Sequence, residues 1–321
     1  MIYAPIIIPT LNRIEHLRRC IKSLQNNPWA RYTPLIISVD YPPEDKYRDG
    51  YHKVCEYLKN GIEGFGDVKI FYQEKNLGAY ENEKFLLKYI EGNFDRYIFT
   101  EDDNEFSPNF IEYIDKGLEI FENDERIITI CASGAPNPED EENNVILSQN
   151  YTGYGCGTWL KKDKDIRKQI NRDFLFSIVG NLNLLLELAQ KQSGLLLSLQ
   201  SAVFRKEKLY QLPDNEVPLI DQTKKLYLIS EKKYVVSACI RKGRTWGRDG
   251  SGVNCPKDDN YHAEMIEIDT REHFEYRFSV PIKESIMKDT HSLGSICRII
   301  AAIIKLKVWR LKVRVTGNST I

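Results

Sequence analysis

The stretch Ile6-Ile7-Ile8-Pro9-Thr10 begins a pattern of strand, loop and helix that recurs along the chain. Its β-branched residues favour a strand, which Pro9 and Thr10 end. Apolar side chains then recur every three or four residues through residues 14–25, the spacing of an amphipathic helix. Further apolar runs alternate with helical patterns, at residues 35–39, 68–72, 97–100 and 127–131. This alternation predicts right-handed βαβ units and an α/β fold with a mostly parallel sheet flanked by helices.

The composition is that of an ordinary globular protein, with 42% hydrophobic and 28% charged residues among 321. It excludes collagen-like, disordered and many-pass membrane classes. The formal net charge is −1, so no field of the whole chain favours binding to nucleic acid. The seven cysteines are scattered singly, which suits a reducing compartment. The first residues lack the basic flank and apolar segment of a signal peptide, so we expect a cytoplasmic protein.

The second half of the chain has weaker signals. Residues 134–150 are rich in acids, Asn and Pro and predict a solvated loop, and residues 153–159 predict a loop of glycines and aromatics. Residues 164–212 have a largely helical pattern, and residues 234–240 predict a late strand. We expect one domain over residues 1–280 and a separate tail over residues 281–321.

Polar side chains follow several of the predicted strands. In open α/β sheets the ligand crevice lies outside the carboxyl ends of the strands. The sharpest feature is Glu101-Asp102-Asp103, directly after the apolar run at residues 97–100. Adjacent carboxylates that are partly buried repel one another and lose solvation, so a cation is their natural compensation, and oxygen ligands suit Mg²⁺ or Mn²⁺. The alternative is an acidic turn that caps the next helix.

Around these residues the sequence resembles the GT-A glycosyltransferases of family 2 type, which use a nucleotide-sugar. The resemblance covers roughly residues 5–255 and rests on an ordered set of motifs: Pro9-Thr10-Leu11-Asn12-Arg13, Ser38-Val39-Asp40, Asn76-Leu77-Gly78 and the acidic triplet. Residues 101–113 are similar to the metal-binding segment of inverting N-acetylglucosaminyltransferases. Residues 153–159 and 249–252 are similar to loops of bacterial members. The resemblance implies a Rossmann-like GT-A fold.

The resemblance also implies roles for the matching residues. The residues that would bind the nucleotide-sugar are Pro9, Thr10, Asn12, Arg13, Asp40, Asn76, Gly78, Glu101 and Asp102. Within this set, Asp40 would accept a hydrogen bond from a base N–H. Asp103 would bind the metal, Mn²⁺ or Mg²⁺. Taken alone, Thr10 and Asn12 also fit helix capping, and Asn76 to Gly78 also fit an ordinary turn.

An inverting transfer needs a base that takes the proton of the attacking acceptor hydroxyl. The resemblance implies Asp221 for this role, with Asp249 and Glu216 as the next candidates; Asp221 also fits a helix N-cap. Tyr154 and Trp159 fit stacking on a sugar face, or packing in the core. Asp249 also falls in the region expected near the acceptor. Arg244 or Arg248 would help the metal to neutralise the leaving diphosphate, or lie solvated in a loop.

The tail over residues 281–321 is distinct because it contains no acid from Thr290 onward. Its apolar residues and Trp309 alternate with bases at Arg298, Lys305, Lys307, Arg310, Lys312 and Arg314. This pattern predicts an amphipathic helix suited to an anionic membrane surface, and it is too charged to span a bilayer. A helix packed on the domain is the alternative.

Together these features predict an inverting, metal-dependent glycosyltransferase. It would move a sugar from a nucleoside diphosphate, with UDP as the expected nucleotide, to a glycan or lipid-linked glycan, in bacterial polysaccharide biosynthesis at the inner face of the membrane. Two alternatives stay open. A sugar-phosphate nucleotidyltransferase is disfavoured because its Gly-rich, basic phosphate loop is missing after the first strand. A catalytically silent glycan-binding relative at the membrane is disfavoured because the carboxylates are intact.

Overall fold

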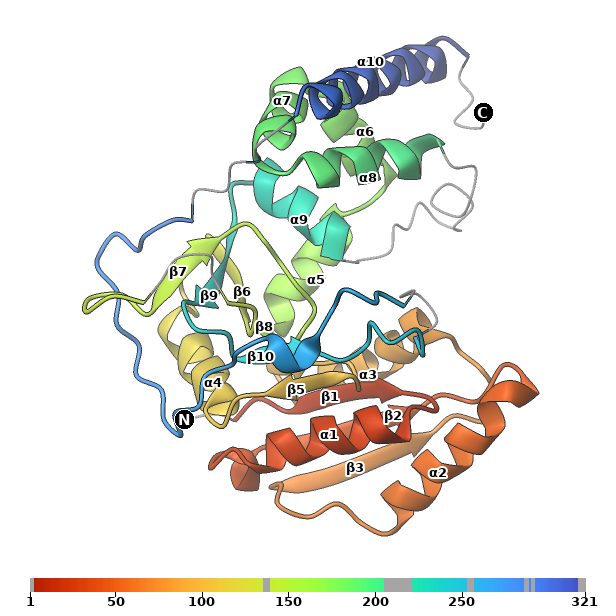
Figure 1. The fold of residues 1–321 in the computed structure, drawn as a ribbon, viewed down its shortest axis with the longest axis vertical. Helices are drawn as coiled ribbons and strands as arrows, with labels where there is room; N and C mark the ends of the chain where they lie inside the picture. Colours follow the sequence, from red (N-terminus) through yellow and green to blue (C-terminus); the bar gives the residue numbers. More distant parts are fainter. Residues whose placement is uncertain are drawn as a thin grey trace. The chain divides into compact units, whose positions relative to one another are not determined.

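The computed structural model describes residues 3–134, 139–204, 221–252, 257–285, 289 and 292–316 (Figure 1). Contacts within the chain divide it into two compact units. Unit 1 comprises Met1–Lys162 and Tyr234–Ser285, and unit 2 comprises Asp163–Lys233 and Ile286–Ile321. This division differs from the predicted one at residue 281, because residues 163–233 group with the C-terminal segment rather than with the sheet.

Unit 1 is built on an eight-stranded sheet among the described residues, in the order β3-β2-β1-β4-β8-β6-β9-β7. Its strands are β1 (Ile6–Thr10), β2 (Pro34–Val39), β3 (Asp67–Tyr72), β4 (Arg96–Phe99), β6 (Ile127–Cys131), β7 (Val145–Ser148), β8 (Cys156–Trp159) and β9 (Tyr234–Ala238). The pairs β3–β2, β2–β1, β1–β4 and β6–β9 are parallel. β8 runs antiparallel to β4 and β6, and β7 runs antiparallel to β9. The α/β fold with a mostly parallel sheet is confirmed.

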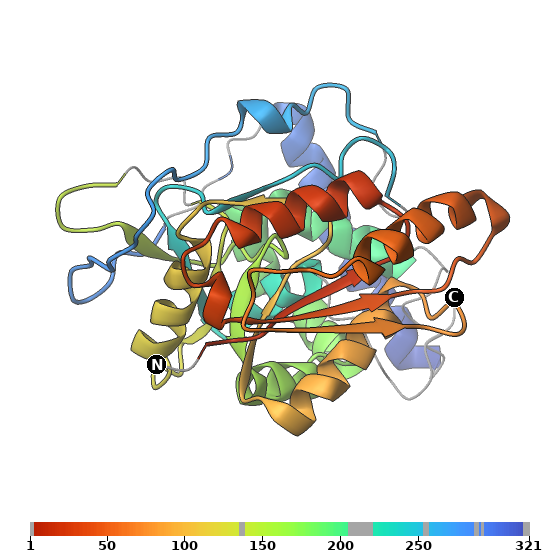
Figure 2. The ribbon, with the colours of Figure 1, turned by 90° about the horizontal axis from the view of Figure 1, so that it is seen from below.

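Helices cover both faces of the parallel half of the sheet. They are α1 (Ile14–Gln25), α2 (Arg48–Lys59) and α3 (Ala79–Asn93). Helix α4 (Phe110–Ile120) packs on β8 and β6 instead, and short 3₁₀ turns are η1 (Ala30–Tyr32), η2 (Asp45–Tyr47) and η4 (Ala263–Met265). Figure 2 shows α1 and α2 on one face and α3 on the other. Because side chains alternate along a strand, Ile6 and Ile8 pack in the core with α1, whereas Ile7 packs with Leu86 and Ile90 of α3.

Two stretches predicted as loops form strands instead. Val145–Ser148 becomes β7, with every residue buried against β9, although acids and Asn residues precede it. Within 153–159, Cys156–Trp159 becomes β8. Its Gly157 is needed for close packing, since a Cβ at this position would lie 2.2 Å from Ile114 of α4. Gly157 therefore serves the close approach of a helix.

A second, two-stranded sheet joins distant parts of unit 1. β10 (Gly243–Thr245) runs antiparallel to β5 (Asn104–Phe106), with Thr245 opposite Asn104. The Trp246 backbone N–H extends this pairing by donating to the Asp103 carbonyl at 2.7 Å. The pairing therefore fixes the segment that follows β10 directly against the acidic triplet.

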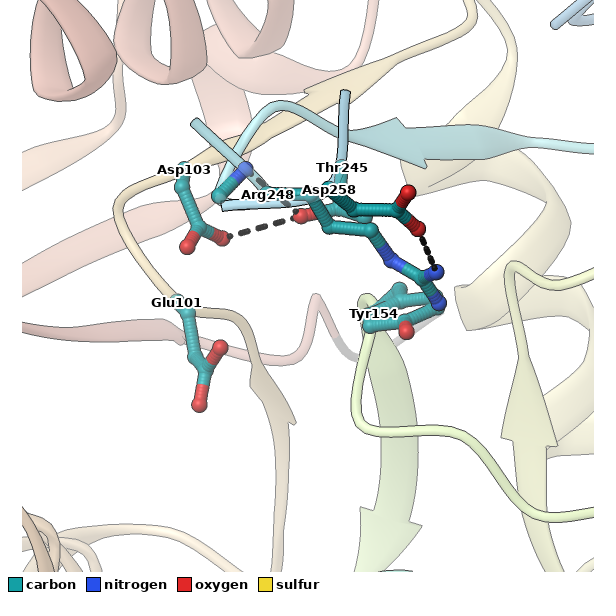
Figure 3. Close-up of a pocket in the computed structure, with 7 residues that line it drawn as sticks. Glu101, Asp103, Tyr154, Thr245, Arg248 and Asp258 are labelled. Atoms are coloured by element: carbon teal, nitrogen blue, oxygen red, sulfur yellow. Dashed lines mark hydrogen bonds and ion pairs between the residues drawn. The ribbon is translucent and has the colours of Figure 1, made fainter. Parts of the chain in front are cut away.

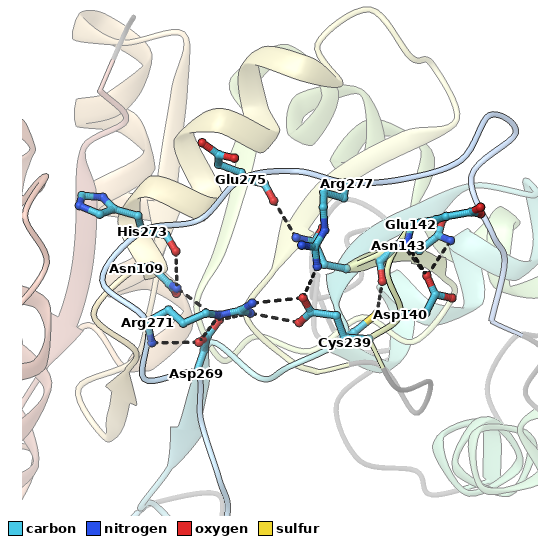
Figure 4. A network of polar contacts seen from close by, with 12 residues as sticks. Asn109, Asp140, Glu142, Asn143, Cys239, Asp269, Arg271, His273, Glu275 and Arg277 are labelled. Atoms are coloured by element: carbon cyan, nitrogen blue, oxygen red, sulfur yellow. Dashed lines mark hydrogen bonds and ion pairs between the residues drawn. The ribbon is translucent and has the colours of Figure 1, made fainter.

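A polar network anchors the end of unit 1 to its core, and Figure 4 shows the part of it around Asp269 and Arg271. Lys242 is fully buried, pairs with Asp269, and lies 4.0 Å from the centroid of the Phe274 ring. Burial lowers the pKa of Lys242 to about 8, although Asp269 favours its charged form. Arg271 also donates to Asp269 and to Glu139. These contacts hold the segment after η4 in place although it has little regular structure.

Unit 2 is helical. Its helices are α6 (Arg172–Gly180), α7 (Leu182–Lys191), α8 (Ser193–Phe204), α9 (Asp221–Ser230) and α10 (Leu293–Thr316), and α5 (Leu160–Gln169) begins at the end of unit 1. Asn171 and Asn181 cap α6 and α7 by accepting from backbone N–H groups three residues on. Helix α10 packs on α6 and α8. No helix in the described part of the chain is long and apolar enough to cross a membrane.

Asp115 of α4 is a carboxyl group buried in the core of unit 1. It is 1% exposed, Oδ1 accepts from the Ala4 N–H at 3.0 Å, and Oδ2 has no partner. Burial raises the pKa of Asp115 to about 7 from an ordinary value of 3.8. The folded protein therefore holds a proton that the unfolded chain releases above pH 4, so this residue costs stability as pH rises from about 4 to 7.

Asp115→Asn is therefore expected to raise the free energy of unfolding at pH 7 by about 1–3 kcal/mol, since each pKa unit corresponds to about 1.4 kcal/mol. The gain should vanish near pH 4. Urea unfolding at both pH values measures it, with Glu119→Gln, an exposed carboxylate of the same helix, as the control. An equal effect of Asp115→Asn at both pH values would contradict the burial argument.

Candidate active site

The carboxylates that follow β4 lie against the loop between β1 and α1. The Thr10 hydroxyl donates to Asp102 Oδ2 at 2.6 Å. The Arg13 guanidinium spans both acids: Nη1 donates to Asp103 Oδ2 at 2.9 Å, and Nη2 donates to Asp102 Oδ1. Residues that follow two neighbouring parallel strands thus meet at one edge of the sheet.

The electrostatics of this cluster are those of buried charges. Asp102 is 3% exposed and Asp103 6%. Burial raises the pKa of Asp102, and the charge of Arg13 lowers it only in part. Burial alone would lower the pKa of Arg13, but Asp102 and Asp103 outweigh it and hold that pKa above its usual value. The guanidinium therefore stays charged and is the cation that makes the two adjacent carboxylates tolerable.

Asp40, which follows β2, holds the turn at residues 76–78. Its Oδ1 accepts from the N–H groups of Tyr41 and Leu77, at 2.9 and 2.8 Å. Its Oδ2 accepts from the Gly78 N–H at 2.9 Å and from Asn76 Nδ2 at 3.1 Å. Four hydrogen bonds fill the acceptor capacity of a carboxylate. In this structure Asp40 therefore anchors the turn and has no acceptor position left for the N–H of a nucleotide base. Gly78 takes a positive φ of 81°, which favours glycine, and opens α3.

Pro9 and Asn12 have supporting positions. Pro9 lies within β1, opposite Ser38 of β2. Asn12 lies half-buried in the following loop, and its carbonyl oxygen would lie 2.3 Å from a Cβ at position 50, so Gly50 is required there. Both residues shape the loop that carries Thr10 and Arg13.

A cavity of about 290 Å³ opens beside Asp103 (Figure 3). Its lining residues all belong to unit 1 and are Glu101, Asp103, Tyr154, Thr245, Gly247, Arg248 and Asp258. Thr245 Oγ1 lies 3.4 Å from Asp103 Oδ1 and accepts from the Gly247 N–H. A Cβ at Gly247 would lie 2.0 Å from Asp103 Oδ2, so only glycine allows this close approach.

Arg248 brings a cation to the opposite part of the cavity lining. Its Nη1 lies 3.3 Å from Asp258 Oδ2, and its guanidinium lies 4.6 Å from the centroid of the Tyr261 ring. A hydrogen bond with Tyr154, followed by that with Asp258, raises the pKa of Arg248. The ion pair with Asp258 is about two-fifths exposed at both ends, so its contribution to stability is small, on the order of 1 kcal/mol or less. Arg248 can therefore change partners at low cost.

The donor set suits a divalent cation only when other ligands join it. In the described residues no three side chains of His, Cys, Asp or Glu gather closely enough to hold a metal alone. Asp102 is already bonded through both oxygens, whereas Asp103 Oδ1 has only the long contact with Thr245. Mg²⁺ is commonly bound by one or two carboxylates together with substrate phosphates. Asp103 fits that arrangement as a protein ligand.

The structure separates the other predicted site residues. Trp159 is wrongly predicted to meet a sugar, because its ring is 4% exposed in the core and its Nε1 donates to the Leu118 carbonyl. Tyr154 does line the cavity. Asp249 lies outside the lining and is bonded to Ser251 and His16, which lower its pKa to about 2 against the effect of burial.

The two remaining base candidates lie elsewhere in the chain. Asp221 is the first residue of α9 in unit 2. Glu216 lies outside the described residues.

Sequence reasoning missed three lining residues, Thr245, Gly247 and Asp258. Thr245 belongs to a three-residue strand, which is too short for a periodic signal. The glycines at 247, 250 and 252 did mark a loop, but nothing in the sequence connected it to the triplet. Only the pairing of β10 with β5 brings this loop next to the acidic triplet.

Comparison with known proteins identifies the family. The model of the family described as glycosyl transferase family 2 matches residues 6–182. No curated protein sequence matches the chain. The solved structures similar to it include Staphylococcus aureus TarS residues 1–349 in complex with UDP, with 16% identity, a TM-score of 0.37, and coverage of 57% of this chain and 56% of that one. Mouse xyloside xylosyltransferase 1, apo form, has 9% identity, a TM-score of 0.36, and coverage of 72% and 83%.

The chain thus spans about half of the TarS chain. At TM-scores this low the assignment rests on the family model, which covers more than half of the sequence and includes the β1 loop, the Asp40 turn and the acidic triplet. The chain belongs to glycosyl transferase family 2.

Proposed function

We propose that the protein transfers a sugar from a nucleoside diphosphate, UDP being the favoured one, to a hydroxyl group of a glycan acceptor with inversion at the anomeric carbon. The observation that carries this proposal is the cavity between Asp103 and Arg248. It combines a buried carboxylate at the strand end with an arginine that can change partners, the two kinds of group that a diphosphate with a divalent cation requires.

The roles follow from the contacts. Asp103 would bind Mn²⁺ or Mg²⁺, which supplies charge neutralisation for the departing diphosphate. Arg248 would exchange Asp258 for a diphosphate oxygen, because its present ion pair is exposed and weak. Tyr154, beside Arg248, offers its ring to the sugar. Glycosyl transfer is preferred to nucleotidyl transfer because it is the activity of the family.

This arrangement predicts that UDP raises the thermal unfolding temperature when Mn²⁺ is present and that Asp103→Asn abolishes the shift. Transfer from UDP-sugars should fall by at least about 100-fold in this variant, as expected for loss of a group that positions charge stabilisation. Differential scanning fluorimetry and a UDP-release assay measure both effects. Asp49→Asn, an exposed carboxylate of α2 paired with Lys53, is the control. An unchanged UDP shift in Asp103→Asn would contradict the assignment.

For the general base we propose Asp221, from the family resemblance, with Asp258 as a second candidate that its position in the cavity lining favours. Asp249 is less suited, because its low pKa makes it a weak proton acceptor.

Replacing the base with Asn should lower kcat by roughly 10²–10⁴-fold with little change in the KM for the donor. Steady-state kinetics of Asp221→Asn and Asp258→Asn identify which residue acts. Asp259→Asn, the exposed neighbour of Asp258, is the control. Full activity in both test variants would show that another group is the base.

We also propose that helix α10 lies on an anionic membrane surface, where a lipid-linked acceptor would be found. Trp309 does not belong to the exposed face of this helix, because it is 4% exposed and stacks on Phe176. The opposite face carries an exposed apolar stripe of Ile296, Ile300, Ile304, Val308 and Leu311. Exposed Arg298 and Lys305 accompany it, and the segment contains no acid. An apolar stripe among bases suits an anionic interface.

The double substitution Ile300→Ser with Ile304→Ser should weaken sedimentation with vesicles of anionic phospholipid by about tenfold or more, since each buried isoleucine contributes on the order of 1.5–3 kcal/mol. Vesicles of neutral phospholipid and the matched substitution Ile120→Ser, at an exposed position of α4, are the controls. Equal binding of the wild type and the double variant to anionic vesicles would rule out this surface.

A further inference from the structure

Arg13 occupies the position where the charge of a cation is needed. It is the last residue before α1, and its side chain makes no helix-capping hydrogen bond. Its two terminal nitrogens are divided between two acids, Nη1 on Asp103 and Nη2 on Asp102. The side chains in this cluster are 17%, 4% and 8% exposed for Arg13, Asp102 and Asp103. Solvent therefore screens this ion pair far less than it screens the pair of Arg248 and Asp258.

The oxygens of the two acids are mostly taken within the protein. Thr10 and Arg13 take the two oxygens of Asp102, and Arg13 takes one oxygen of Asp103. A divalent cation that approached Asp103 alone would come close to the guanidinium and be repelled by it. If the guanidinium left first, it would lose two charge-assisted hydrogen bonds to buried carboxylates. Either course makes binding of the bare metal unfavourable.

A bound diphosphate makes binding of the metal favourable. Its oxygens carry negative charge that offsets the metal, and they are acceptors of the geometry that a guanidinium binds well. We infer that Arg13 is a built-in counter-cation of the carboxylate pair, a positioning residue that makes binding of the metal depend on the diphosphate of the donor. This inference rests on the proposed function and adds to it a coupling between two ligands of the same site.

The coupling predicts the behaviour of the wild-type protein. Mn²⁺ alone should bind weakly, and UDP should tighten Mn²⁺ binding by about tenfold or more, a typical coupling between two ligands. Electron paramagnetic resonance of free Mn²⁺ measures both affinities without any turnover. If UDP leaves Mn²⁺ binding in the wild type unchanged, the proposed function itself fails, whatever the variants do.

Arg13 variants test the inference separately. Arg13→Met and Arg13→Gln should bind Mn²⁺ alone about tenfold more tightly than the wild type, and UDP should tighten that binding less. The glutamine amide can still donate to the carboxylates, so this variant carries the test if Arg13→Met fails to fold. Arg13→Lys keeps the charge and should restore weak binding of the bare metal. Arg18→Met, at an exposed arginine of α1, is the matched control.

Two outcomes would overturn the inference about Arg13. If UDP and Mn²⁺ bind together in the wild type, but Arg13→Gln binds Mn²⁺ alone no more tightly than the wild type, Arg13 is not the counter-cation and only this inference is overturned. Equal tightening in Arg13→Lys and Arg13→Gln would also overturn it, because the effect would then not depend on charge.

Discussion

Two carboxylates that are adjacent in sequence and almost fully buried, Asp102 and Asp103, share one guanidinium at the carboxyl edge of the sheet. Burying like charges side by side is unfavourable unless a cation and hydrogen-bond donors are built around them. The end of β1 supplies the donor Thr10, and the loop after it supplies the cation Arg13. Because β1 and β4 are parallel neighbours, the residues at their carboxyl ends lie at the same edge of the sheet. The rest of the site is arranged around this cluster.

The two arginines of the site differ in what holds them. Arg13 is bound between two buried acids, whereas Arg248 forms an exposed ion pair with Asp258 and a contact with Tyr154. A buried charge pair resists loss of either partner, and an exposed pair exchanges partners readily. In the cavity lining, Asp103 is thus a carboxylate held in place by Arg13, whereas Arg248 is a cation that can change partners. This combination suits a ligand that brings both negative phosphate and its own cation.

Sequence reasoning predicted the sheet and the acidic cluster because both depend on local signals. Apolar runs mark the parallel strands, and three adjacent carboxylates after a strand stand out without any structure. It failed where a role depends on packing between distant segments. Gly157 allows α4 to approach β8, and Trp159 is buried in the core, so the second half of the predicted loop, Cys156–Trp159, is a buried strand. Asp40 was correctly placed after β2, but its bonds to the 76–78 turn depend on a loop that folds back onto it.

The proposed function requires Asp103 and Arg248 to flank the diphosphate of a nucleotide-sugar donor. A crystal structure of the protein grown with UDP and Mn²⁺ would show whether they do. We expect the metal within bonding distance of an Asp103 carboxylate oxygen, the diphosphate in the cavity, and Arg248 turned from Asp258 toward a phosphate oxygen. A nucleotide bound away from this cavity, or a metal that leaves Asp103 without contact, would contradict the account.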